Sequence, residues 1–222
     1  MSCSKRNSKK VKCSLKGNAP NVKSLRELVK HYKKHHQLDL DWRDNLSIIE
    51  AVFGDNNYNS EIEPLQTIPT DLKWDNFQAN PHQARHYSKE ELKEIAISLA
   101  ANWNRTSFKD FDDLYDYVHS ILVISSINPN GKVQNPRALI IYDIALRLAR
   151  RFGVWPKKYV YLNGIGPFKG AKALCLGKYI KYRRILYSDI IKYYPELKEL
   201  DAAELENFLC WYFKQLNLFN RI

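Results

Sequence analysis

The sequence lacks several features that would place the protein in a specialised class. Its 222 residues contain only eight glycines and nine prolines, too few for a collagen-like or low-complexity chain. The longest apolar runs, such as residues 121–127, are far shorter than the roughly 20 residues that a membrane-spanning helix needs. The N-terminus is basic and has no apolar stretch of the kind found in secretory signals. We therefore expect a cytoplasmic protein without a membrane partner.

Metal-binding and cofactor-binding patterns are also missing. The four cysteines lie far apart in the sequence, at Cys3, Cys13, Cys175 and Cys210. None has the paired spacing of a zinc finger, so we expect reduced thiols and no structural metal. His31 and His35 stand four residues apart, as do His82 and His86, but no third ligand follows either pair. No nucleotide-binding or hydrolase fingerprint is present, and we expect no bound cofactor.

Acidic residues are absent from one long part of the chain. The net charge is +11, yet residues 144–188 contain eleven Lys and Arg and no Asp or Glu. Residues 1–36 carry another eleven bases against the single acid Glu27, whereas residues 37–120 carry sixteen acids against seven bases. A positive field of this kind attracts polyanions, and neutralisation of phosphates dominates the affinity of proteins for nucleic acids. The alternative is that the basic residues pack against the acidic part of the same molecule.

What the chain does contain is ample material for a core. Hydrophobic residues make up 45% of the sequence and aromatic residues 13%. Residues 1–22 have almost no core-forming side chains and are expected to be a disordered basic arm that assists the basic part 144–188 in contacting nucleic-acid phosphates. We expect residues 23–222 to form one helical domain, with an acidic part at 37–120 and a basic part at 144–188.

Helix-capping patterns and apolar periodicity predict an all-α domain of roughly six to nine helices. Ser24, Ser88 and Asp201 are each followed three positions later by Glu, which is the pattern of a capping box at a helix start. The predicted helices cover residues 25–36, 46–53, 88–104, 108–127, 136–152, 179–193 and 202–216. The single strand-like piece is KYVYL at residues 158–162.

The basic part contains the segment LNGIGPFKGAKAL at residues 162–174. Leu162, Gly164, Ile165 and Gly166 stand at positions that match the hairpin of the helix-hairpin-helix (HhH) family of DNA-binding motifs, which this segment resembles. Gly170 departs from the family pattern, which has Ala there. The resemblance covers under a tenth of the chain.

The resemblance implies that this hairpin contacts nucleic acid, with DNA favoured over RNA. Glycine lets a backbone approach a phosphate, and the helix that follows offers free N–H groups and the positive end of its dipole. Lys169 and Lys172 would add charge on the same edge. The residues expected to bind nucleic acid are Gly164, Gly166, Lys169, Lys172, Tyr179, Tyr182, Arg183 and Arg184. If the substrate is single-stranded, the two tyrosines can stack on its exposed bases, and the alternative is that they pack in the core.

Three other interpretations remain open. Gly164 and Gly166 can form a plain tight turn before a core helix. The basic face can dock an acidic protein. HhH-type DNA glycosylases use a Lys that attacks the sugar and an Asp that assists it, and Lys169 precedes Asp189 by a similar separation. Lys169 and Asp189 are thus the candidate catalytic pair.

Overall fold

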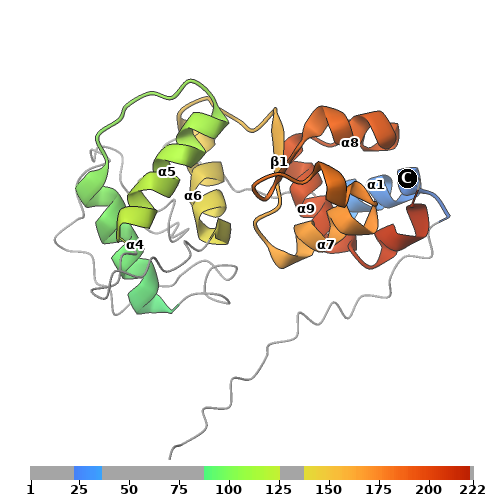
Figure 1. Cartoon of the computed structure of the whole chain (residues 1–222), viewed down its shortest axis with the longest axis horizontal. Helices are drawn as coiled ribbons and strands as arrows, with labels where there is room; N and C mark the ends of the chain where they lie inside the picture. Colours follow the sequence, from blue (N-terminus) through green and yellow to red (C-terminus); the bar gives the residue numbers. More distant parts are fainter. Residues whose placement is uncertain (1–22, 37–87, 126–137, 221–222) are drawn as a thin grey trace, which may run out of the picture.

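The structure is a computed structural model that describes residues 23–36, 88–125 and 138–220. Within these ranges the chain forms seven α-helices, short 3₁₀ helices and one two-stranded antiparallel sheet (Figure 1). The predicted all-α class is therefore confirmed. The predicted arm at 1–22, the predicted helix at 46–53 and the His82/His86 pair lie outside the described residues.

The three predicted capping residues all begin helices. Ser24 caps α1 (Leu25–His35), where its side chain accepts a hydrogen bond from the backbone N–H of Glu27. Ser88 and Asp201 form full capping boxes at the starts of α4 (Lys89–Asn102) and α9 (Ala202–Tyr212). Each box satisfies N–H groups that a helix start leaves without an intrahelical partner.

The helices α4, α5 (Phe111–Ser125) and α6 (Ala138–Arg151) enclose a first hydrophobic cluster. Their apolar residues recur at helical spacing, so each helix turns one continuous face inward. Gly153 follows α6 with a φ of +66°, a left-handed conformation that glycine adopts without strain and that ends the helix as predicted. The buried residues from α4 and α5 include Leu92, Ala96, Leu99, Phe111, Leu114 and Val118.

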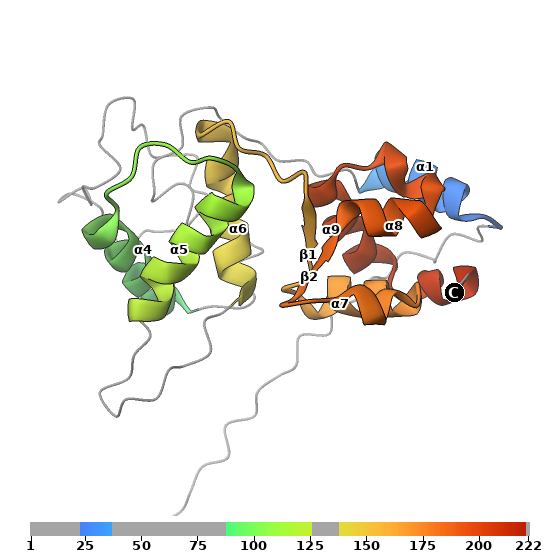
Figure 2. The same ribbon diagram turned by 45° about the horizontal axis from the view of Figure 1, so that its top comes forward.

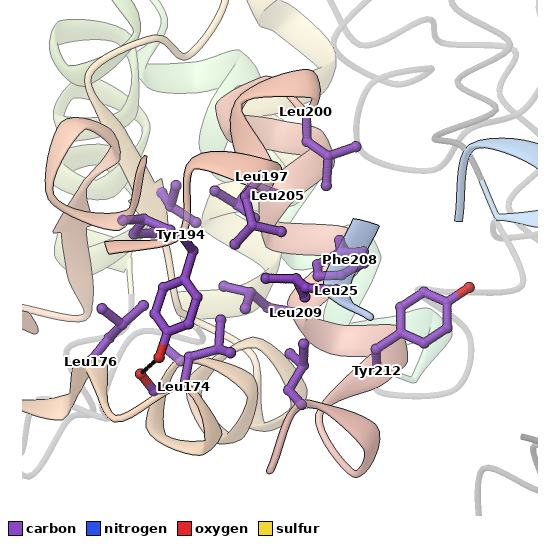
Figure 3. Close-up of a cluster of buried hydrophobic side chains, with 14 of the residues drawn as sticks. Leu25, Leu174, Leu176, Tyr194, Leu197, Leu200, Leu205, Phe208, Leu209 and Tyr212 are labelled. Atoms are coloured by element: carbon purple, nitrogen blue, oxygen red, sulfur yellow. Dashed lines mark hydrogen bonds between the residues drawn. The ribbon is translucent and has the colours of Figure 1, made fainter. Parts of the chain in front are cut away.

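A second hydrophobic cluster joins α1 to the C-terminal helices α7 (Ile165–Ala173), α8 (Tyr187–Tyr193) and α9 (Figure 3). Tyr194 lies fully buried in it, and its hydroxyl donates a 2.7 Å hydrogen bond to the carbonyl oxygen of Leu174. Tyr32 of α1 packs edge-on against Phe208 of α9, with 5.6 Å between the ring centroids. The first and last described parts of the chain thus share one core.

The two strands stand between these clusters. Figure 2 shows β1 (Tyr159–Tyr161) and β2 (Arg184–Leu186) with α4, α5 and α6 on one side and α1, α7, α8 and α9 on the other. Successive side chains of a strand point to opposite faces. Val160 accordingly belongs to the second cluster, whereas Tyr161 belongs to the first and stacks on Tyr142 of α6 with 5.4 Å between centroids.

The helix predicted over residues 179–193 is confirmed only over Tyr187–Tyr193 and is wrong before that. The chain instead forms the 3₁₀ helix η2 (Leu176–Tyr179), a tight turn at residues 181–184, the strand β2 and then α8. Tyr182 and Arg183 adopt left-handed φ values of 49° and 60°, which no α-helix accommodates. Pairing with β1 holds β2 in extended form.

The C-terminal helix is also shorter than predicted. It ends at Tyr212, and the 3₁₀ helix η4 (Gln215–Phe219) follows. None of the helices in the described ranges combines the length and apolar character required to cross a bilayer.

Candidate nucleic-acid interface

The Gly-rich segment that resembles an HhH hairpin joins β1 to α7. Gly164 is the N-cap residue of α7 and supplies no side-chain cap. Ile165, the first residue of the helix, is 74% exposed. The element before the turn is a strand, whereas the HhH family has a helix there. The strand-like pattern of KYVYL is confirmed, and the HhH resemblance remains a prediction.

The glycines of α7 have a packing role. A Cβ atom on Gly166 would lie 2.5 Å from the Sγ of Cys210, and one on Gly170 would lie 2.3 Å from the carbonyl oxygen of Leu209. Both separations are shorter than any ordinary contact, so only glycine allows α7 and α9 to come this close. Gly166 therefore faces a neighbouring helix, and this contact explains its identity without a ligand.

The turn at residues 181–184 projects two side chains that the fold does not bury. The backbone N–H of Lys181 donates to the carbonyl of Arg184 and the N–H of Arg184 donates to that of Lys181, both at 2.9 Å. The Arg183 carbonyl also accepts a 2.7 Å hydrogen bond from Leu162 N–H. These bonds fix the turn, and at its tip Tyr182 is 93% exposed.

An aromatic ring flanked by two cations links this turn to α7. The guanidinium carbon of Arg183 lies 4.6 Å from the ring centroid of Phe168, and the Nζ of Lys172 lies 4.7 Å from the same centroid. The favourable interaction of each cation with the ring holds both Arg183 and Lys172 against Phe168 despite their like charge. We call Phe168, Lys172, Tyr182 and Arg183 the turn cluster.

A second ring, Tyr159 of β1, is flanked in the same way. The guanidinium of Arg184 lies 4.5 Å from its centroid and the Nζ of Lys158 lies 5.0 Å from it. A cavity of about 150 Å³ opens beside Tyr159, and Lys157 and Lys158 contribute to its wall. The basic side chains thus continue from the turn cluster along β1.

Ion pairing leaves most of the cations of the basic part available. Among the Lys and Arg at residues 144–188 whose side chains the structure describes, which leaves out Arg150 and Arg151, two form ion pairs: Arg147 with Asp143 at 3.3 Å and Arg184 with Asp112 at 3.8 Å. The second pair does join the basic part to the acidic part, as the alternative interpretation requires. The cations that form no ion pair with a described residue are Lys157, Lys158, Lys169, Lys172, Lys178, Lys181 and Arg183.

Arg184 is the predicted contact residue that the protein itself engages most. Its partner Asp112 also accepts a short hydrogen bond from the buried hydroxyl of Tyr161. Burial, followed by this hydrogen bond, raises the pKa of Tyr161 well above its ordinary value, so the hydroxyl keeps its proton. Arg184 therefore anchors the strand pair to α5 and has little freedom to reach a ligand.

Tyr179, unlike the exposed Tyr182, is held by contacts within the protein. Its hydroxyl forms a short hydrogen bond with that of Tyr193, which raises the pKa of Tyr179 to about 12. Its ring lies 5.2 Å from the ring of Tyr193 and 5.1 Å from the Nζ of Lys178. Of the two tyrosines expected to stack on bases, Tyr182 is the one whose ring is free.

The candidate catalytic pair is placed on two helices. Lys169 lies on α7, where its Nζ is 5.8 Å from the ring centroid of Phe213, and Asp189 lies in the first turn of α8. Both are described residues, and no ion pair or hydrogen bond connects them. Their catalytic role remains a prediction.

His31 of α1 and His36, the C-cap residue of that helix, act as packing residues. The Nδ1 of His31 lies 2.7 Å from the hydroxyl of Tyr212, and the ring of His36 stacks on Trp211 at 4.2 Å. Burial lowers the pKa of both histidines, and the nearby His35 adds repulsion. Within the described ranges, no three His, Cys, Asp or Glu side chains gather closely enough to hold a metal ion.

Sequence reasoning missed Phe168 and the conformation of Tyr182 and Arg183. Phe168 occupies the position beside Lys169 within α7, and its apolar character suggested nothing beyond packing. No local pattern indicates a left-handed Tyr–Arg pair, because such turns normally carry Asn and Gly.

Comparisons with protein-family models, with curated proteins and with solved structures found no match to this chain.

Proposed function

We propose that this protein binds nucleic acid through a basic surface formed by α7, the turn cluster and the neighbouring residues of β1. The observation that carries the proposal is the set of seven basic side chains that form no ion pair with a described residue, in a stretch that has no acidic residue. Phosphates would supply the missing counter-charge.

The aromatic rings between these cations favour the same function. Phe168 holds Arg183 and Lys172 in place, and Tyr159 holds Lys158. Side chains that are positioned before binding lose less conformational entropy when a ligand arrives. Alternation of basic and aromatic side chains is typical of surfaces that bind nucleic acid.

The start of α7 offers a further contact. Gly164 provides no side-chain cap, and in the first turn only Ile165 and Gly166 offer an N–H group to an outside acceptor, because Pro167 has none and the Phe168 N–H donates to the Gly164 carbonyl. A helix N-terminus favours an anion through these groups and through its dipole. A phosphate at this point is also what the HhH resemblance implies.

A salt-titrated binding assay with a charge-reversal variant tests the proposal. The full chain would be mixed with a fluorescein-labelled 20-nucleotide DNA, single-stranded or as a duplex, over a range of KCl concentrations. For Lys169→Glu/Lys172→Glu we expect roughly tenfold or greater loss of affinity and a log affinity that falls less steeply with log salt, by about one unit for each lysine.

The matched control is Lys34→Glu/Lys198→Glu. It changes the net charge equally, and both lysines are exposed on α1 and η3 (Pro195–Glu199), outside the turn cluster. We expect this control variant to change the affinity for DNA by less than about threefold, because salt screens charges that lie outside the binding surface. Equal losses in the two double variants, or an unchanged affinity in the first, would contradict the proposed surface.

A further inference from the structure

The exposed ring at the tip of the 181–184 turn has no explanation within the fold. Tyr182 makes no hydrogen bond, ion pair or ring contact with any residue that the structure describes, and 93% of its surface is accessible. A tyrosine stabilises a folded protein by burying its ring, and the ring of Tyr182 is almost entirely exposed.

The backbone of the turn makes the choice of residue more unusual. Two consecutive left-handed residues define a turn that normally carries Asn–Gly or Gly–Gly, because a Cβ atom is unfavourable there. Tyr182 and Arg183 keep this conformation because the paired bonds of Lys181 and Arg184 impose it. Strained residues held in this way by their surroundings cluster at functional sites.

We infer that the ligand of this surface is single-stranded nucleic acid, and that Tyr182 stacks on one of its unpaired bases. The inference rests on the proposed function and specifies its substrate class. A base in a duplex is stacked on both faces and paired at its edge, so it presents no free face to Tyr182. An unpaired base offers a free face to the ring of Tyr182. The phosphates on either side of that base would then lie near the positive charges of Lys172, Lys181 and Arg183.

The charge around Tyr182 selects this partner over an apolar or acidic protein surface. The neighbours in sequence are Lys181 and Arg183, and Arg183 is held on Phe168 beside Lys172. Single-stranded nucleic acid carries regularly spaced negative charges with planar bases between them, and this arrangement matches a tyrosine surrounded by cations. Duplex DNA would satisfy the cations and leave the tyrosine unused.

The test uses variants of Tyr182 that leave the charge unchanged. Tyr182→Gly removes the ring and suits the left-handed conformation, so it does not disturb the turn. Tyr182→Phe keeps the ring and removes only the hydroxyl. The full chain would be titrated with fluorescein-labelled oligothymidylate and oligouridylate of 15 nucleotides and with a 15-base-pair duplex, with thermal unfolding as a check of folding.

For Tyr182→Gly we expect affinity for the single strands to fall about 5- to 100-fold, as for loss of one base–aromatic stack. Affinity for the duplex should stay within about twofold, Tyr182→Phe should resemble the unaltered protein, and the salt dependence should not change because no charge is altered.

Failure of the inference and failure of the proposed function give different results. The stacking role is refuted, and the basic surface stands, if Tyr182→Gly binds single strands as tightly as the unaltered protein does. It is refuted in the same way if Tyr182→Gly loses affinity equally for single strands and for the duplex. If the unaltered protein binds none of the three probes, the proposed function is refuted and the stacking role with it.

Discussion

Gly170 gives the most direct check on how closely α7 packs against α9. In a Gly170→Ala variant the new Cβ would lie 2.3 Å from the carbonyl oxygen of Leu209 and 2.9 Å from its carbonyl carbon. Both atoms belong to the backbone of α9, so no side-chain rotation relieves the contact. One of the two helices must move by about 1 Å to reach ordinary van der Waals separation.

The magnitude follows from two opposing terms. Overpacking a core costs about 1–3 kcal/mol, and a clash with backbone places this site near 3 kcal/mol. Alanine is favoured over glycine inside a helix by about 1 kcal/mol. We therefore expect Gly170→Ala to lower the free energy of unfolding by about 2 kcal/mol, which for a chain of this size lowers Tm by about 4–8 °C.

Urea denaturation followed by circular dichroism measures this change, and Gly177→Ala is the matched control. A Cβ on Gly177 would meet only the side chain of Lys172, at 3.9 Å, so the control should change stability by less than about 0.5 kcal/mol. If Gly170→Ala were as stable as the unaltered protein, the close approach of α7 to α9 would be refuted.

Two further predictions concern buried polar groups. Burial, with repulsion from Asp143, raises the pKa of Glu206 to about 8, so the folded state loses stability as the pH rises from the unfolded pKa near 4.5 towards 8. Because the residue is only half-buried, we expect Glu206→Gln to raise the free energy of unfolding by roughly 1–3 kcal/mol at pH 8 and not at all at pH 4.5. A gain that does not depend on pH would contradict this reasoning. Tyr194→Phe removes the donor to the Leu174 carbonyl, and we expect urea denaturation to show a loss of about 1–2 kcal/mol, whereas a change under about 0.5 kcal/mol would mean that this bond contributes little.

Features set by a few neighbouring residues could be predicted from the sequence. Ser24, Ser88 and Asp201 begin helices because each forms its cap with a Glu three positions away, and this needs no tertiary contact. Gly153 ends α6 for an equally local reason. The all-α class follows from such elements.

Features that depend on distant residues could not be predicted. The strand β2 exists because Arg184–Leu186 pairs with Tyr159–Tyr161, and helix α7 separates these two segments in the sequence. Gly170 departs from the HhH pattern because the Leu209 carbonyl occupies the space that an alanine would need, and no spacing within residues 162–174 reveals that helix. In the candidate site, the sequence indicated the lysines and Arg183, but only the structure separates the exposed Tyr182 from the tethered Tyr179 and Arg184.

The division of the core into two clusters bears on how the chain folds as it is synthesised. Helices α4, α5 and α6 are consecutive among the described elements and can pack while the rest of the chain is still being made. The apolar face of α1 leaves the ribosome before any of them, yet its partner Phe208 lies on the last α-helix. Until α9 emerges, that face lacks the partner that Phe208 provides in the folded protein. Loss of the C-terminus by early termination would therefore strand the N-terminal helix, with aggregation or degradation as the expected fate of the fragment.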